Sequence, residues 1–239
     1  MRTLPLLALA ACGTGAPAPA AVESPPSNQV APRATPAPEV QWDSAANRFV
    51  APALPAVARG AEIVVLPIHE NDSGRGAPNL RLELRDRTDK TTQTIALMRP
   101  DEYERLVVET TKAGPELERR LGAANRELAK LHGLHDLQAM HGLEVQKPAD
   151  DKLQHLAIGD GLDIDFAGDH LHVFRHNANN AFITLDTRGW LAKLDKCEHP
   201  AYLAAVYHAN EINVLVVEIA YTGTDTCWEP SNQLHVVAW

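Results

Sequence analysis

Hydrophobic and polar residues alternate along several short stretches of the chain, a pattern typical of half-buried β-strands. Leu80, Leu82 and Leu84 alternate with arginine and glutamate, and the continuous apolar run 63–68 precedes them across a turn-rich loop. From residue 142 onward almost every apolar segment has strand character, and most connections are too short for parallel crossovers. The further expected strands are 91–98, 143–146, 162–166, 171–174, 182–185, 202–208, 214–221 and 234–239.

One segment repeats its apolar residues with helical spacing instead. Its apolar face is formed by Leu117, Leu121, Ala124, Leu128 and Leu131. Charged residues fill the opposite face of this segment. Pro115 is favourable in the first turn of a helix, and Gly133 is expected to end the helix. We therefore predict one main amphipathic helix at about 115–132, within an α+β fold in which antiparallel sheet predominates.

The N-terminal residues have the pattern of an export signal. A positive Arg2 is followed by an uncharged stretch that ends in small residues. The run Leu9-Ala10-Ala11-Cys12 resembles the lipobox of bacterial membrane lipoproteins, in which a leucine and two small residues precede the cysteine that is lipidated. The resemblance implies that residues 1–11 are a signal peptide and that Cys12 carries acyl chains such as palmitate. It also implies an anchor in the cell envelope, on the periplasmic or extracellular face.

The segment after this cysteine is rich in alanine and proline. Residues 12–40 have no apolar periodicity, and such a composition favours extended conformations of about 3.1 Å per residue. We expect a disordered tether that holds a folded domain away from a membrane surface. The remaining residues 41–239 are expected to form the β-rich globular part, either as one domain or as two packed lobes, 41–112 and 113–239.

Charge and composition limit the partners of this domain. The chain has a formal net charge of −9, with 45% hydrophobic and 22% charged residues. Residues 1–40 contain two basic and two acidic groups, so the acidic excess belongs to the folded part. Acidic surfaces repel phosphate backbones, which excludes nucleic acid as the expected partner. A membrane reached through the anchor, and an envelope protein or polysaccharide, are the partners that we expect.

Two cysteines remain once Cys12 is assigned to lipidation. Cys197 and Cys227 form an even pair in a protein that we expect to be exported, and such a pair is most simply a disulfide. In the chain-entropy model a loop of this length contributes roughly 3 to 4 kcal/mol. A cysteine nucleophile is correspondingly disfavoured.

Several catalytic motifs are missing from the sequence. Only three serines lie beyond the tether, and none of them stands in a G-x-S-x-G elbow. His69-Glu70 lacks the second histidine of an H-E-x-x-H zinc motif, and no glycine-rich phosphate loop occurs. Acyl transfer by serine and phosphate-loop chemistry are therefore not expected.

A dense group of acidic and histidine side chains falls on a predicted hairpin. If Gly168 and Asp169 form a two-residue turn, Phe166 faces Leu171, Ile164 faces Val173, Asp165 faces His172 and Ala167 faces His170. The apolar pairs then share one face of the hairpin, and the polar pairs share the other. Cross-strand pairing on a solvated sheet face is the simplest interpretation of the polar side.

The same polar face also suggests a metal site. Asp165, His170 and His172 offer carboxylate and imidazole ligands of the kind that bind zinc or another divalent transition metal. A site needs a third or fourth ligand that converges on the ion, and the sequence pattern does not supply one. A calcium loop starting at Asp163 fits less well, because Ala167 and Phe174 occupy ligand positions.

A second histidine group lies at the end of the predicted helix. It comprises His132, His135, Asp136 and His141. Histidines near a helix C-terminus interact favourably with the helix dipole, which explains them without a metal.

Two functions are consistent with these patterns. The favoured one is a non-enzymatic binding or structural module, lipid-anchored in the cell envelope and without a cofactor. The alternative is a metal-dependent hydrolase that uses Asp165, His170 and His172, with a nearby acid as general base.

Overall fold

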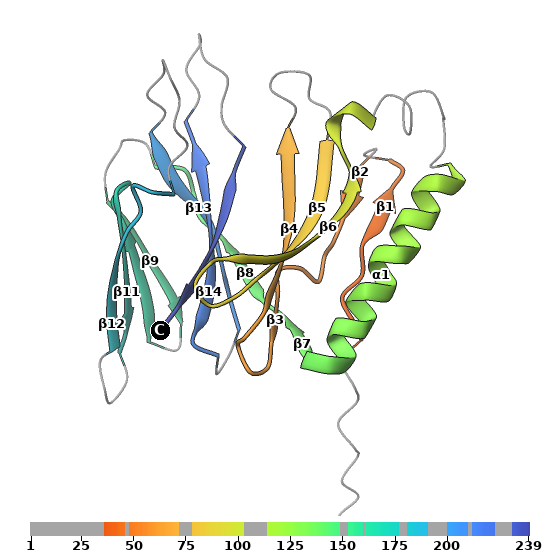
Figure 1. Cartoon of the computed structure of the whole chain (residues 1–239). Helices are drawn as coiled ribbons and strands as arrows, with labels where there is room; N and C mark the ends of the chain where they lie inside the picture. Colours follow the sequence, from red (N-terminus) through yellow and green to blue (C-terminus); the bar gives the residue numbers. More distant parts are fainter. Residues whose placement is uncertain are drawn as a thin grey trace, which may run out of the picture. The chain divides into compact units, whose positions relative to one another are not determined.

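Antiparallel strands make up most of the regular structure in the computed structural model of the chain (Figure 1). The structure describes residues 36–45, 48–71, 78–102, 114–148, 153–159, 161–176, 181–190, 200–209, 212–222 and 231–239. The chain divides into two units, Met1–Ala34 and Thr35–Trp239, and every described residue belongs to the second. Each strand pair within these residues runs antiparallel, which confirms the predicted predominance of antiparallel sheet.

The described strands form three larger sheets and one two-stranded ribbon. The five-stranded sheet contains, in order, β6 (Thr91–Met98), β5 (Pro78–Arg85), β4 (Val64–Asn71), β3 (Ala56–Ala58) and β7 (Leu137–Ala139). The middle sheet contains β15 (Gln233–Ala238), β14 (Val214–Tyr221), β13 (Ala201–His208) and β8 (His141–Glu144). The outer sheet contains β12 (Ala181–Asp186), β11 (His170–Arg175), β10 (Leu162–Phe166) and β9 (Gln154–Gly159). The ribbon contains β1 (Gln41–Asp43) and β2 (Arg48–Val50).

The sequence pattern does not predict every strand. It misses β1, β2, β3 and β7, which have three residues each and are too short to display an alternation. It also misses β9, and it places β8 two residues late. The longer strands β6, β10 and β14 have the predicted bounds.

The predicted helix is α1 (Pro115–His135), which follows the short 3-10 helix η1 (Pro100–Glu102). The buried residues of α1 are Leu117, Ala124, Leu128 and Leu131, all from the predicted apolar face. The helix continues through Gly133 and ends where Asp136 adopts a left-handed conformation, with its N–H bonded to the carbonyl of His132. No helix within the described ranges is long and apolar enough to cross a membrane.

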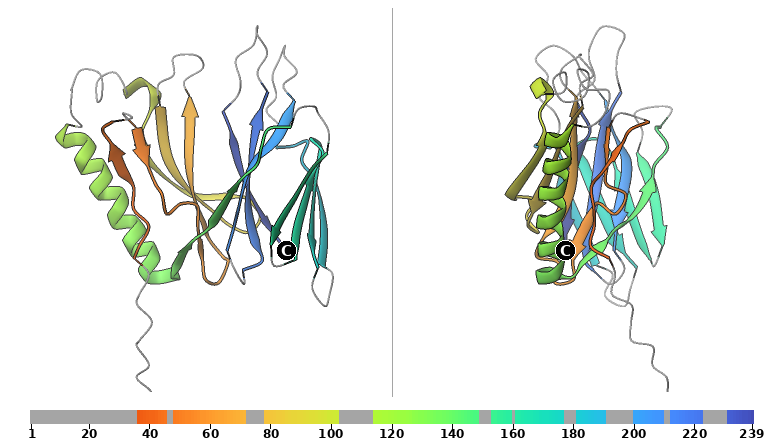
Figure 2. Two further views of the ribbon diagram at one scale, coloured as in Figure 1. Left: turned by 180° about the vertical axis from the view of Figure 1, so that it is seen from behind. Right: turned by 90° about the vertical axis from the view of Figure 1, so that its right-hand side faces the viewer.

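Three apolar clusters show that the second unit is built in layers (Figures 1 and 2). On one face of the five-stranded sheet, Leu82 belongs to a cluster with residues of α1 and the β1–β2 ribbon. On the other face, Leu66 shares a cluster with Val216 of the middle sheet. The opposite side of the middle sheet packs on the outer sheet, where Val217 meets Ile164. Because β14 is covered on both faces, apolar residues occupy both of them, and Glu218 is the one charged residue of the strand.

The packing of the second unit extends across two positions at which the sequence predicts a boundary, residue 40 and residue 112. Val40, at the end of the predicted tether, is buried. Its backbone N–H and carbonyl bond to the side chain of Asn125 on α1, at 2.8 and 2.9 Å. The helix and β7 pack with the strands of residues 41–112, although the two-lobe alternative assigns them to 113–239. Long-range contacts thus cross the positions 40 and 112, while the division into tether and lobes stays a prediction.

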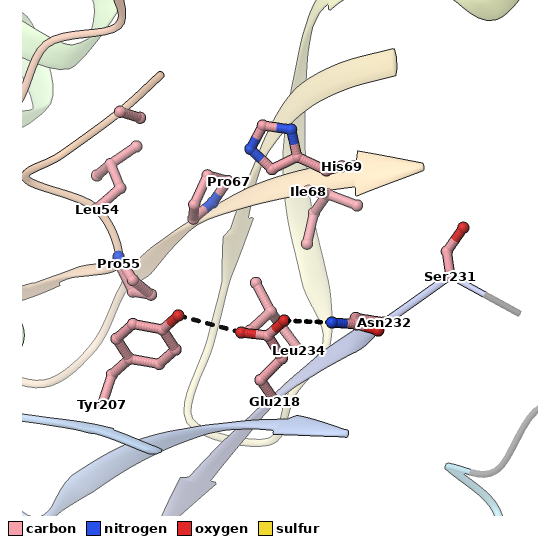
Figure 3. Close-up of a pocket in the computed structure, with 11 residues that line it drawn as sticks. Leu54, Pro55, Pro67, Ile68, His69, Tyr207, Glu218, Ser231, Asn232 and Leu234 are labelled. Carbon is pink, nitrogen blue, oxygen red and sulfur yellow. Dashed lines mark hydrogen bonds between the residues drawn. The ribbon is translucent and has the colours of Figure 1, made fainter. Parts of the chain in front are cut away.

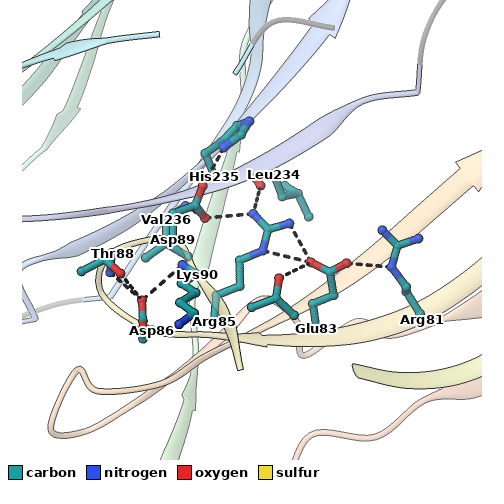
Figure 4. Close-up of polar contacts among 11 residues, drawn as sticks. Arg81, Glu83, Arg85, Asp86, Thr88, Asp89, Lys90, Leu234, His235 and Val236 are labelled. Atoms are coloured by element: carbon teal, nitrogen blue, oxygen red, sulfur yellow. Dashed lines mark hydrogen bonds and ion pairs between the residues drawn. The ribbon is translucent and has the colours of Figure 1, made fainter. Parts of the chain in front are cut away.

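The polar side of β5 is covered instead of facing solvent (Figure 4). Glu83 is buried, and it accepts bonds from Arg81 and Arg85, each at 2.7 Å. Burial by itself raises the pKa of Glu83, but the two guanidinium groups outweigh it and lower the pKa below its ordinary value. The carboxylate is thus charged and paired inside the unit.

The same ion network continues to the last strand, β15 (Figure 4). Arg85 also donates to Asp89, at 2.8 Å, and to the backbone carbonyl of Leu234. Asp89 in turn bonds to Nδ1 of His235 at 2.7 Å and accepts the N–H of Val236 at 2.8 Å. Burial raises the pKa of Asp89, yet these bonds lower it overall. The turn after β5 therefore joins the five-stranded sheet to the edge of the middle sheet.

Candidate functional site

The predicted hairpin is present with the predicted register. Phe166 lies opposite Leu171, Ile164 opposite Val173 and Asp165 opposite His172. Gly168 has a φ of +72°, which suits the first position of the two-residue turn. The apolar residues face the middle sheet, and the polar ones lie on the outer face of the outer sheet.

The three candidate metal ligands on this hairpin contact three different partners. Asp165 lies 2.6 Å from Nδ1 of His155. His172 contacts the hydroxyl of Thr184 at 3.0 Å, and His170 contacts the neighbouring Asp169 at 2.8 Å. The rings of His170 and His172 are nearly parallel, with centroids 6.3 Å apart. Among the residues that the structure describes, no group of three His, Cys, Asp or Glu side chains is arranged to hold a metal ion.

The sequence interpretation missed one member of this face, His155. It lies on β9, where His155 and Ala157 alternate with Leu156 and Ile158. This period-two pattern could have predicted the strand, although not its pairing with β10. The hydrogen bond that His155 donates to the Asp165 carboxylate raises the pKa of His155 above its ordinary value. The polar face is thus a row of paired side chains in contact with solvent.

The four residues of the second histidine group also contact different partners. The Nδ1 atom of His132 contacts the carbonyl of Leu137, His135 contacts the carboxylate of Glu62, Asp136 pairs with Arg59, and the ring of His141 lies beside that of His208. Capping of the helix end and cross-strand packing account for these contacts. The group does not converge on one point.

A pocket of about 410 Å³ lies between the five-stranded sheet and the middle sheet (Figure 3). Its lining comes from β4, from the segment before β3, and from the strands and flanking residues of the middle sheet. The apolar part of this lining includes Leu54, Pro55, Pro67, Ile68 and Leu234. Segments far apart in the sequence therefore form one concave surface.

Glu218 on β14 is the acidic residue of this lining (Figure 3). One of its carboxylate oxygens accepts a bond from the hydroxyl of Tyr207 at 3.1 Å, and the other accepts one from Nδ2 of Asn232 at 2.6 Å. Burial and the charge of Glu218 raise the pKa of Tyr207, so its hydroxyl keeps its proton and remains a donor. Both donors are neutral: they orient the carboxylate without cancelling its charge.

The position of Tyr207 depends on a glycine across the sheet. Gly142 on β8 pairs with Tyr207 on β13. A β-carbon at position 142 would lie 2.9 Å from the tyrosine ring. Only the absence of a side chain there leaves room for the ring as it lies.

His69 on β4 is the basic residue among those that line the pocket. Burial and the nearby charge of Arg48 lower its pKa, whereas the charge of Glu218 raises it, and the net result is below the ordinary value. The imidazole is therefore mostly neutral near pH 7. It supplies a hydrogen-bonding group to the pocket without a full positive charge.

The sequence contains one signal for this pocket. Glu218 is the charged residue within the apolar run 214–221, and a charge inside a buried strand is unusual unless it has a partner or a function. His69, Tyr207 and Asn232 stand in segments that carry no recognisable motif. Only folding shows that they lie near Glu218.

Comparison with known proteins assigns no function to the pocket or to the hairpin. No protein-family model matches the chain, and neither a curated protein nor a solved structure matches it. The predicted lipidation site Cys12 and the predicted disulfide partners Cys197 and Cys227 lie outside the described residues.

Proposed function

We propose that this chain is a lipid-anchored protein of the cell envelope whose α+β domain binds a small ligand in the pocket between the five-stranded and middle sheets. The pocket itself carries the proposal: a hollow of about 410 Å³ is lined by both apolar and polar side chains, and one oriented carboxylate faces it. Small-ligand sites usually combine apolar residues with a few fixed polar groups, in volumes of roughly 300–1,000 Å³.

Binding is favoured over catalysis by the kinds of side chain around the pocket. Its described lining contains Glu218 but no second carboxylate or cysteine. Glu218 is held by neutral donors, which suits recognition better than proton transfer. The geometry does not favour a metal-dependent hydrolase, because Asp165, His170 and His172 contact separate partners.

A ligand screen tests the binding function. We expect a library of small compounds of mixed charge, measured by ligand-observed NMR with the full chain in detergent, to yield compounds that bind. Leu234→Trp places an indole in the pocket, so these compounds should lose binding to that variant. Leu153→Trp, on an exposed residue outside the pocket lining, is the matched control and should bind them as the parent does.

Two outcomes would contradict the proposal. The library could yield no binder at all, or the binders could bind equally well to the Leu234→Trp variant. Circular dichroism of both tryptophan variants would verify that the sheets are retained.

The anchor is tested separately through Cys12. With Cys12 intact we expect incorporation of labelled palmitate and partition into the detergent phase, because two or more acyl chains give stable membrane attachment. Cys12→Ser should lose both properties. Equal labelling and partition of parent and variant would remove the lipid anchor from the proposal and leave the pocket unaffected.

A further inference from the structure

Glu218 has an unusual environment for a carboxylate. Its neighbours on the same face of β14, Val216 and Ala220, are buried apolar residues. The pocket lining also includes the apolar residues Pro67 and Leu54. A carboxylate in such surroundings is costly unless it is hydrogen-bonded and its charge is compensated.

The described residues supply the hydrogen bonds of Glu218 but no cation that pairs with it. Tyr207 and Asn232 each donate to one oxygen, and both are neutral groups. Within the described residues, no lysine or arginine forms an ion pair with Glu218. His69, the basic residue of the lining, is mostly neutral near pH 7. Among the described residues, the carboxylate of Glu218 is therefore oriented by hydrogen bonds but has no ion-pair partner.

This contrasts with the other partly buried carboxylates of the domain. Glu83 pairs with two arginines, and Asp89 pairs with Arg85 and His235. Among the described residues, Glu218 has no such cationic partner, and the pocket adjoins its carboxylate. The space in front of the carboxylate is therefore suited to an external cation.

The geometry points to a small organic cation as the ligand: an ammonium group binds Glu218, and an apolar body of the same molecule packs against Leu54, Pro67 and Leu234. The inference rests on the proposed function, since it names the ligand class of the same pocket. Each carboxylate oxygen has acceptor capacity beyond the one bond that it receives, so an ammonium can donate to it. The net charge of −9 also attracts cations and repels anions.

Three indole probes of similar size separate charge from shape. Tryptamine is a cation near pH 7, tryptophol is neutral and indole-3-acetate is an anion. We expect isothermal titration calorimetry with the full chain to show tryptamine binding about tenfold or more tightly than tryptophol, because a hydrogen bond to a charged group contributes more than a neutral one. Indole-3-acetate should bind most weakly.

The nearly isosteric variant Glu218→Gln tests whether this carboxylate carries the preference. It keeps an oxygen for Tyr207 but removes the charge, so tryptamine and tryptophol should bind within about threefold of each other. Glu127→Gln makes the same change in net charge on the exposed side of α1, and it should leave the preference as it is in the parent.

The possible outcomes are distinct. Equal binding of all three probes, or tightest binding of the anion, would overturn the cation inference while the binding function stands. A cation preference that persists in Glu218→Gln would show that another group carries it, which also overturns the inference. If none of the three probes binds the parent at concentrations up to about 10 mM, which corresponds to a very weak affinity, the result would count against both the binding function of the pocket and the cation inference. The comparison of probes on the parent needs no variant, so it holds even if Glu218→Gln folds poorly.

Discussion

The polar side of β5 and the polar side of the β10–β11 hairpin arise from the same alternation of residues, yet their surroundings differ. Between the sheets, the network that begins at Glu83 reaches His235, whose side chain is only 12% exposed. On the outer sheet, Asp165 pairs with His155, whose side chain is 61% exposed. An alternating strand thus indicates which residues share a face, but not whether that face is covered.

The difference has an energetic consequence. A buried network loses its solvation when it forms, so removing one member leaves the others charged or polar without water. An exposed pair is solvated in any case and contributes little. We therefore expect similar substitutions in the two regions to have very different effects on stability.

Asp89→Ala should have the largest effect. It removes the acceptor of Arg85, of His235 Nδ1 and of the Val236 N–H at once. We expect it to lower the free energy of unfolding by about 3 kcal/mol, measured by urea denaturation at pH 7.

The matched change on the outer sheet is Asp165→Ala. It leaves the exposed His155 to be solvated, and the expected loss is below about 1 kcal/mol in the same measurement. Equal losses for Asp89→Ala and Asp165→Ala would show that coverage by the middle sheet does not govern the stability of these networks.

The ion pair between Glu102 and Arg120 lies outside both regions and provides a third test of how ion pairs stabilise the domain. The Arg120 guanidinium donates to both carboxylate oxygens, at 2.8 and 2.9 Å, and lowers the pKa of Glu102 to about 2. A lowered pKa means that the stabilisation is present above the ordinary value of 4.5 and is lost as the pH falls toward 2. Glu102→Gln should cost about 1 to 2 kcal/mol at pH 6, since the pair is partly solvated.

Urea denaturation of the parent and the Glu102→Gln variant at a series of pH values checks this prediction. The difference between the two proteins should shrink steadily below pH 4.5. A difference that stays constant down to pH 2 would contradict the assignment of the pair.

The smallest effect is expected for His155, on the solvated face. Its bond to Asp165 raises its pKa above 6.5, so the pair stabilises the fold below that value and the contribution is lost as the pH rises through the raised pKa. NMR titration of the imidazole should show the raised pKa in the parent and a return toward 6.5 in Asp165→Asn. An unchanged His155 titration in Asp165→Asn would exclude the pair as the cause.

Local patterns predicted much of the outer sheet and the helix. The hairpin register follows from its turn and from the alternation around Ile164 and Asp165, because both signals lie within a few residues of each other. The helix start and its buried face follow from Pro115 and the leucine spacing in the same way. The helix end differs by three residues, since Asp136 and not Gly133 adopts the terminating left-handed conformation.

The sequence by itself determined which residues of each strand and of the helix share a face, because this property depends only on the backbone period. Tertiary structure alone decided what covers each face. It buried Glu83 between two sheets, left His155, the partner of Asp165, exposed to solvent, and brought His69, Tyr207 and Glu218 to one pocket from separate strands. Such contacts join residues far apart in the chain, so no local period encodes them.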